Sequence, residues 1–277
     1  MPPPRTTKGG ADGKRELASG KLVLDEPAPG VARLTISNPE KRGALDHELL
    51  DALADTVRGQ DAPCLLLTGE GEMFSAGYDI GSLEGADFSE RAERIVAHPF
   101  HAAIEAIEQY RYPVVCAING HAIGGGLELA ITCDIRIAAR GVKLGMPPAK
   151  LGLIYSHTGL KKFIEACGVA NTNELFFVGR NVDADRGAEM GLVSAVVEPA
   201  DLGDTALSTA AEIAGNAPLS LAGNKMIIRT LRTVPSALPE EIEEGLIELR
   251  ESCFRSEDFR EGVRAFGEKR KPEWKGR

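Results

Sequence analysis

The residues best suited to chemistry lie where a glycine run meets one carboxylate. Three glycines, Gly124 to Gly126, follow an apolar run at residues 113–118 that is typical of a buried strand. Residues 127–132 then follow the pattern of a short helix, whose first N–H groups would be unpaired and point back at the glycines. Glu128 lies in this first turn. The pattern predicts a place where N–H groups hold a developing negative charge beside one carboxylate.

A second turn of small residues lies earlier in the chain, at residues 74–80, which read Phe-Ser-Ala-Gly-Tyr-Asp-Ile. It follows a predicted buried strand at residues 64–68, just as the glycine run follows the strand at residues 113–118. Strand, turn and helix therefore recur along the chain, each time with small residues at the end of the strand.

The remaining pattern divides the chain into a mixed core and a helical end. Residues 21–24 and 31–37 predict a hairpin, and Asp46 is a candidate N-cap because leucines follow it at helical spacing. After residue 201 the composition favours helices and leaves little room for strands. We therefore predict an α/β core at residues 21–200 and a helical region at residues 201–277. Residues 1–20 are interpreted as a loose, disordered tail, with a transit or recruitment segment as the alternative.

Composition excludes several classes of function. The chain has 277 residues with a net charge of −9, which disfavours non-specific binding to nucleic acid. It contains no apolar run of the roughly 20 residues that a membrane span needs. The cysteines show neither paired nor metal-ligand spacing, which favours buried thiols in a reducing, cytoplasmic setting; they are Cys64, Cys116, Cys133, Cys167 and Cys253.

Four segments together resemble the crotonase (enoyl-CoA hydratase/isomerase) superfamily, and the similarity extends from about residue 22 to the end. They are residues 38–45, 74–79, 119–134 and 257–272. The resemblance implies a crotonase-type spiral of repeated β-β-α turns with a C-terminal helical oligomerisation region. It also implies an acyl-CoA thioester substrate and a homotrimer or homohexamer. Neither a metal nor a cofactor other than the coenzyme A of the substrate is expected.

The resemblance also assigns roles to individual residues. The backbone N–H groups of Tyr78 and Gly125 would form an oxyanion hole for the thioester carbonyl, and fixed donors of this kind stabilise an enolate without reorganising. Glu128 matches the first of the two glutamates that hydratases use. Substrate or coenzyme A contacts are expected from a further set: Lys41, Arg42, Ala44, Ala76, Tyr78, Asp79, Ile80, Gly124, Gly125, Pro148 and Lys269.

The second hydratase glutamate is missing. The family pattern places it after Gly145-Met146-Pro147, where this chain has Pro148. Proline has no ionisable group, so it can neither donate nor accept a proton in the reaction. Hydration by the usual pair of carboxylates is therefore in doubt.

The residues around Tyr155 differ from the hydratase pattern in the same region and resemble the branch that decarboxylates methylmalonyl-CoA-type substrates. In that reaction Tyr155 or Glu128 would supply a proton, and His157 would orient or neutralise the departing carboxylate. The alternatives are structural: Tyr155 packs its ring against the acyl chain, and residues 156–158 cap the following helix. A protein that binds acyl-CoA with little catalytic activity is the hypothesis of a different class.

Overall fold

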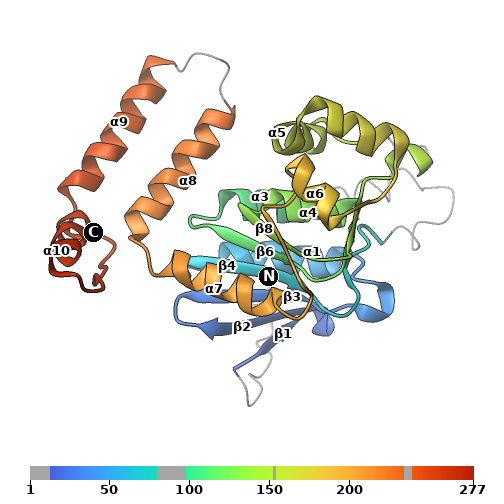
Figure 1. Cartoon of the computed structure of the whole chain (residues 1–277), viewed down its shortest axis with the longest axis horizontal. Helices are drawn as coiled ribbons and strands as arrows, with labels where there is room; N and C mark the ends of the chain where they lie inside the picture. The colour runs from blue at the N-terminus through green and yellow to red at the C-terminus, as the bar shows by residue number, and fades with distance from the viewer. Residues whose placement is uncertain (1–12, 80–97, 152–153, 234–238) are drawn as a thin grey trace, which may run out of the picture.

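The computed structural model describes residues 13–79, 98–151, 154–233 and 239–277, whose arrangement Figure 1 shows. Two sheets form its centre. The larger sheet has the order β1-β2-β3-β4-β6-β8-β11, with these bounds: β1 (Arg15–Leu17), β2 (Leu22–Ala28), β3 (Val31–Ile36), β4 (Cys64–Gly69), β6 (Val114–Ile118), β8 (Ile135–Ala139) and β11 (Ala195–Val197). The smaller sheet has the order β10-β9-β7-β5, with these bounds: β10 (Val182–Asp183), β9 (Lys143–Gly145), β7 (His121–Ile123) and β5 (Met73–Ser75).

The chain alternates between the two sheets in a repeated turn. A strand of the large sheet leads to a strand of the small sheet and then to a helix, as in β4-β5-α3, β6-β7-α4 and β8-β9-α5. Successive turns stack in parallel: β4 pairs with β6 and β6 with β8, while β5 pairs with β7 and β7 with β9. The predicted spiral of β-β-α turns is confirmed. It brings the ends of consecutive small-sheet strands side by side.

Helices cover the sheets and extend beyond them. Within the described residues they are α1 (His47–Arg58), α3 (His98–Gln109), α4 (Gly125–Thr132), α5 (His157–Asn173), α6 (Ala184–Met190), α7 (Leu202–Ala214), α8 (Pro218–Thr233), α9 (Glu240–Arg255) and α10 (Glu257–Glu268). Short helical turns are η1 (Ala18–Gly20), η2 (Pro39–Lys41), η5 (Pro148–Leu151) and η6 (Glu174–Val178). In the described part of the chain, no helix combines the length and the apolar character that crossing a membrane requires.

Local sequence signals account for several of these elements. Asp46 caps α1, because its side chain accepts a hydrogen bond from the Leu49 N–H at 3.0 Å. The leucines that follow at helical spacing are fully buried. Strand β6 is buried at every position, as its continuous apolar run predicts.

The structure differs from the sequence prediction at both ends of the core. Residues 15–17, expected to belong to a loose tail, form strand β1 and pair antiparallel with β2. This strand is held by backbone pairing at the edge of the sheet. It contains no apolar run from which a strand could have been predicted. Helix α7, assigned to the helical region after residue 201, packs across β4 and β6 with Ala206 and Ala210 fully buried.

Helices α8 and α9 lie side by side as an arm that leads away from the sheets, with α10 at its far end (Figure 1). The arm is tied to the core through the middle of α8, where Lys225 Nζ lies 2.7 Å from Asp134 Oδ2, and through its last turn, where Arg232 pairs with Glu165 of α5. Its far end folds back on itself, because the Asp258 carboxylate accepts hydrogen bonds from the backbone of Lys275 and Gly276. The Trp274 indole donates to the Gly215 carbonyl at 2.6 Å, which fixes this end beside α7.

Candidate active site

The glycine run turns the chain from β7 into α4. Gly124 has φ 57° and ψ −124°, a conformation that only glycine adopts readily, and its N–H donates to the Gly145 carbonyl at 2.8 Å. Helix α4 begins at Gly125, two residues earlier than the sequence predicted. As the first residue of the helix, Gly125 has an N–H without a partner inside the helix.

The second small-residue turn lies directly against the first. Gly77 has φ 88°, and a Cβ added there would lie 2.8 Å from the Ile123 carbonyl oxygen and 3.0 Å from the Gly125 nitrogen. The contact between the two backbones therefore requires glycine at this position. The Ser75 hydroxyl supports the turn, because it accepts from the Gly77 N–H and donates to the Gly43 carbonyl.

Tyr78 follows Gly77 and runs beside Leu45. The Leu45 N–H donates to the Gly77 carbonyl at 2.8 Å, and the Asp79 N–H donates to the Leu45 carbonyl at 3.2 Å. These bonds use the groups on either side of Tyr78 and leave its own N–H outside the pairing. The Tyr78 ring packs on Gly125, where an added Cβ would lie 3.0 Å from Cε1, and edge-on against Phe100. Tyr78 and Gly125, the two residues to which the resemblance assigns the oxyanion hole, therefore lie in contact.

Glu128 lies one turn into α4 and is only 4% exposed. Its backbone N–H bonds to the Gly124 carbonyl, and its Oε2 accepts a hydrogen bond of 2.5 Å from the Tyr155 hydroxyl. Burial raises the pKa of Glu128, whereas the hydrogen bond from Tyr155 and the charge of Lys162 lower it. A buried carboxyl with a raised pKa beside unpaired N–H groups is suited to proton transfer.

Tyr155 is held in place by aromatic and glycine contacts. Its ring packs edge-on against Phe176, with centroids 5.5 Å apart, and lies so close to Gly159 that an added Cβ would be 2.6 Å from Cε1. Burial raises the pKa of the Tyr155 hydroxyl well above its usual range, and the neighbouring charge of Glu128 acts in the same direction. The phenol therefore stays protonated and can donate.

His157 and Pro148 flank this pair in sequence. His157 is exposed at the first position of α5, and among the described residues no hydrogen bond is found for its side chain. The cap of α5 is Ser156, whose hydroxyl accepts from the Gly159 N–H at 3.1 Å. Pro148 is buried and begins η5.

The residues expected to bind coenzyme A fall into two groups. Lys41 lies at the surface near the site, with Nζ 2.8 Å from Asp79 Oδ2. The loop around it is tied to the second turn, because the Ala76 N–H donates to the Arg42 carbonyl at 3.0 Å, and Ala44 is buried beside it. Lys269 instead follows α10 at the far end of the arm, away from α4 (Figure 1). Ile80 lies outside the described residues.

Comparison with known proteins decides the family. The family model for enoyl-CoA hydratase/isomerase matches residues 26–277. The chain belongs to the enoyl-CoA hydratase/isomerase family. The short-chain-enoyl-CoA hydratase of Clostridium acetobutylicum is 34% identical over 260 residues, which cover 91% of this chain and 96% of the relative. The carnitinyl-CoA dehydratase of Salmonella paratyphi A is 33% identical over 273 residues, which cover 94% of this chain and all of the relative.

Solved structures of the family share the fold. An enoyl-CoA hydratase/isomerase family protein from Hyphomonas neptunium superposes with a TM-score of 0.82 at 31% identity, covering 93% of this chain and 98% of that one. The enoyl-CoA hydratase from Bacillus anthracis gives a TM-score of 0.83 at 30% identity, covering 93% and 100%. The predicted crotonase resemblance is therefore confirmed for the whole core and the helical end.

One feature beside the family site was missed by sequence reasoning. Lys162 looks like half of a surface Lys-Lys pair, yet its side chain is only 10% exposed. The helical spacing indicates this burial. Gly159, Phe163 and Cys167 are buried along one face of α5, and position 162 lies on the same face. Lys162 Nζ lies 2.6 Å from the Glu108 carboxylate on α3.

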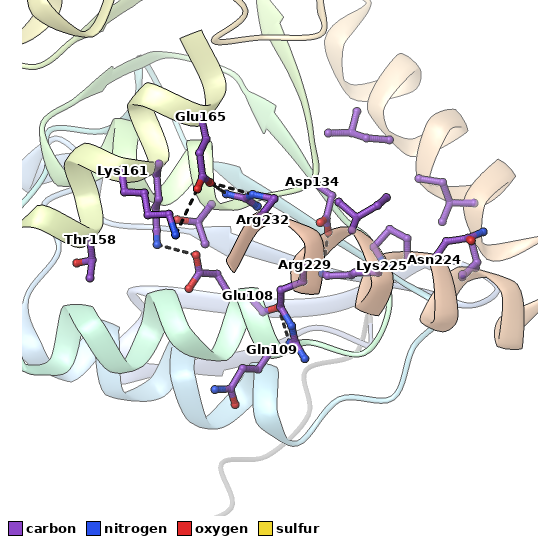
Figure 2. Close-up of a pocket in the computed structure, with 17 residues that line it drawn as sticks. Glu108, Gln109, Asp134, Thr158, Lys161, Glu165, Asn224, Lys225, Arg229 and Arg232 are labelled. Atoms are coloured by element: carbon purple, nitrogen blue, oxygen red, sulfur yellow. Dashed lines mark hydrogen bonds and ion pairs between the residues drawn. The ribbon is translucent and has the colours of Figure 1, made fainter. Parts of the chain in front are cut away.

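A cavity of about 860 Å³ opens behind this pair, between α3, α5 and α8 (Figure 2). In Figure 2 Glu108, Glu165 and Arg232 point into it from these three helices. Neither Glu128 nor Tyr78 lines it, so the cavity is separate from the turns that form the site. Across residues 13–79, 98–151, 154–233 and 239–277, no group of three or more His, Cys, Asp or Glu side chains is arranged to hold a metal.

Proposed function

We propose that this family member adds water to, or removes it from, the double bond of an enoyl-CoA thioester, using Glu128 as its single catalytic carboxylate. The observation that carries the proposal is the 2.5 Å hydrogen bond from the Tyr155 hydroxyl to Glu128. It supplies a second proton-carrying group to a site in which Pro148 replaces the family's second glutamate. The names of the hydratase and dehydratase relatives support the same reaction class.

The thioester carbonyl would accept from the N–H groups of Tyr78 and Gly125. Addition at carbon 3 moves charge onto this oxygen, where two fixed donors stabilise it without reorganising. One such donor is typically worth about 2.7–4 kcal/mol in the transition state. The close contact of Gly77 with the start of α4 supports this arrangement, because it brings the two turns that carry these N–H groups against each other.

Glu128 and Tyr155 would complete the proton balance. The Glu128 carboxylate takes a proton from water as the water oxygen bonds to carbon 3, and the enolate forms. Tyr155 gives its hydroxyl proton to carbon 2, and the phenolate then recovers a proton from the now neutral Glu128 through their hydrogen bond. Both groups return to their starting states, so the pair needs no second carboxylate.

The remaining assignments belong to the same proposal. The loop at Lys41 and Arg42 would face the coenzyme A moiety with Ala44, Ala76 and Asp79 beside it, and no cofactor beyond that coenzyme A takes part. Lys269 would reach a site only across a subunit boundary, in a homotrimer or homohexamer joined through the helical end. We expect the protein to act in the cytoplasm and His157 to contact the substrate from the edge of the site.

Decarboxylation of a methylmalonyl-CoA-like thioester is the second candidate. It is favoured by two features together: Pro148 stands where the second carboxylate would be, and the Tyr155 hydroxyl bonds to Glu128. In this reaction the bond between carbon 2 and the carboxylate breaks, CO2 leaves and its electron pair forms the enolate. The same two N–H groups would hold that charge. A proton from Tyr155 or Glu128 then restores carbon 2, and no activated water is needed.

Two substrates and two variants separate these functions. The protein is incubated with crotonyl-CoA and with methylmalonyl-CoA while hydration and CO2 release are followed. We expect hydration that falls by about 10²- to 10⁴-fold in Glu128→Gln and by about 10²-fold or more in Tyr155→Phe. CO2 release that survives Glu128→Gln but not Tyr155→Phe would establish the decarboxylase instead. Micromolar binding of acyl-CoA without either activity would identify a binding protein.

Gly159→Ala is expected to lower kcat by roughly 10- to 100-fold, because the added methyl group displaces the Tyr155 ring from Glu128. Gly203→Ala is the matched control, since nothing lies within 4 Å of a Cβ at that position in α7. The control should keep its kinetics and gain up to about 1 kcal/mol of stability. Steady-state kinetics and thermal unfolding test both; an unchanged kcat in Gly159→Ala would contradict the role of the ring position.

A further inference from the structure

The Tyr155 hydroxyl is placed by its ring, because the backbone that carries it has no regular structure. Residues 154–156 belong to neither a helix nor a strand, and the hydroxyl reaches Glu128 Oε2 at 2.5 Å. Two contacts position the ring: an added Cβ at Gly159 would lie 2.6 Å from Cε1, and the Phe176 ring packs edge-on with centroids 5.5 Å apart. Gly159 leaves room for the Tyr155 ring, whereas Phe176 offers a surface on which that ring rests.

Phe176 reaches this place because helix α5 is interrupted at Gly168. This glycine has φ 75° and ψ 165°, far from helical values, so the chain changes direction there. The Phe176 ring lies 5.1 Å from the Phe163 ring, centroid to centroid. In an unbroken helix two residues thirteen positions apart would be separated by about 20 Å along the axis. The chain after Gly168 therefore folds back along the first part of α5 and brings Phe176 to Tyr155.

The turn that carries Phe176 is π-helical, and it packs on η5 as well as on α5. Such turns are rare and frequently occur at functional sites. Phe176 is 5% exposed, whereas its neighbour Phe177 is 75% exposed, so the turn buries one ring and leaves the other outside. Where the turn ends, an added Cβ at Gly179 would lie 3.2 Å from Cε of Lys150 in η5. The turn thus joins Tyr155 to the short helix that begins at Pro148.

We propose that Phe176 is a positioning residue of the active site, whose ring holds the Tyr155 ring where the hydroxyl reaches Glu128. The inference rests on the proposed role of Tyr155 as the proton donor. A smaller side chain at position 176 leaves space into which the Tyr155 ring can move, and a misplacement of about 1 Å can cost a factor of roughly 10² in rate. Phe176 would act on the reaction through Tyr155 alone.

An ordinary core residue that only stabilises the fold is the competing explanation, and a double-mutant cycle distinguishes the two. The variants are Phe176→Leu, Tyr155→Phe and the double variant. Phe177→Leu is the matched control, because it makes the same exchange at the exposed neighbouring position of the turn. Hydration of crotonyl-CoA gives kcat and KM, and thermal unfolding gives stability. The position of the phenol is followed by ¹⁹F NMR of fluorotyrosine-labelled protein, in which Tyr155→Phe identifies one signal among four tyrosines.

Phe176→Leu should lower kcat by roughly 10-fold while KM stays within about 2-fold, since the ring moves the proton donor and not the coenzyme A site. In the Tyr155→Phe background the same exchange should change kcat by no more than about 2-fold. The Tyr155 ¹⁹F signal should shift in Phe176→Leu and stay in place in Phe177→Leu. An equal loss of kcat in both backgrounds, or lower stability with an unchanged kcat and an unmoved signal, would overturn the proposal.

Phe176→Met serves in the same cycle if Phe176→Leu does not fold, because methionine fills much of the volume without a flat ring. The NMR measurement separates this inference from the proposed function. A shifted Tyr155 signal in a protein without hydration activity would refute the proposed function and leave the positioning of the ring established. Hydration that survives Tyr155→Phe, together with an unmoved signal in Phe176→Leu, would refute both.

Discussion

Glu128→Gln is expected to lower kcat for hydration of crotonyl-CoA by about 10²- to 10⁴-fold, because glutamine keeps the shape of the side chain but cannot accept the proton of water. The Tyr155 hydroxyl can still donate to the amide oxygen, so the packing around it is retained. Glu212→Gln, at an exposed position on α7, is the control and should keep full activity. Residual hydration close to that of the wild type would contradict a single-carboxylate mechanism.

The same variant should be more stable than the wild type at neutral pH. Burial raises the pKa of Glu128 above its ordinary value of 4.5, so ionisation above that pH favours the unfolded chain. Below pH 4.5 the carboxyl is neutral in both states and the two proteins should unfold alike. The difference in the free energy of unfolding between the two proteins grows as the pH rises. It reaches its full value above the pKa that Glu128 has in the folded protein. Single stabilising substitutions of this kind typically add about 0.5–2 kcal/mol, and urea unfolding across pH measures the difference.

The second large effect is expected at Gly125, where one N–H can be removed with little else. Proline is tolerated at the first position of a helix, and Gly125 is that residue in α4. Gly125→Pro should therefore lose a donor to the thioester oxygen, and we expect kcat to fall by about 10²- to 10³-fold relative to Gly125→Ala.

Gly125→Ala is the control for this loss, because it adds the same Cβ beside the Tyr78 ring while keeping the N–H. Its own effect should be modest, since ring atoms 3.0–3.3 Å away need to move by only a few tenths of an ångström. Coenzyme A binding and thermal unfolding verify that the proline variant is folded. Equal activity of the two variants would show that this N–H does not hold the charge.

Much of the fold and the family could be predicted from local sequence patterns. The helix capped by Asp46 and the buried strand β6 follow from signals within a few residues, and both formed as expected. The resemblance to the family assigned the turns at Gly77 and Gly125 to one site, and the structure places these two turns against each other. In each case the residues that determine the structure are close together in the sequence, or their pattern is repeated along it.

The contacts that depend on distant packing were not predictable. Tyr155 and Glu128 were identified separately, but their hydrogen bond joins residues 27 positions apart and depends on how α5 settles on α4. Strand β1 escaped prediction because edge pairing with β2 requires no apolar pattern. Lys162 was overlooked because lysine is usually exposed, and only the burial of its helix neighbours reveals its environment.

Where the turn at Gly77 meets the turn at Gly125, backbone atoms pack directly against backbone atoms. A Cβ at Gly126 would lie 2.4 Å from the Ser75 carbonyl oxygen, so this contact is closed to any larger residue. The groups that can move protons, in contrast, are side chains carried by α4 and the start of α5. On the proposed mechanism, activation of the thioester and the choice of reaction would therefore reside in parts of the molecule that can vary independently. A new reaction could arise on this scaffold through one or two side-chain exchanges while the backbone turns stay unchanged.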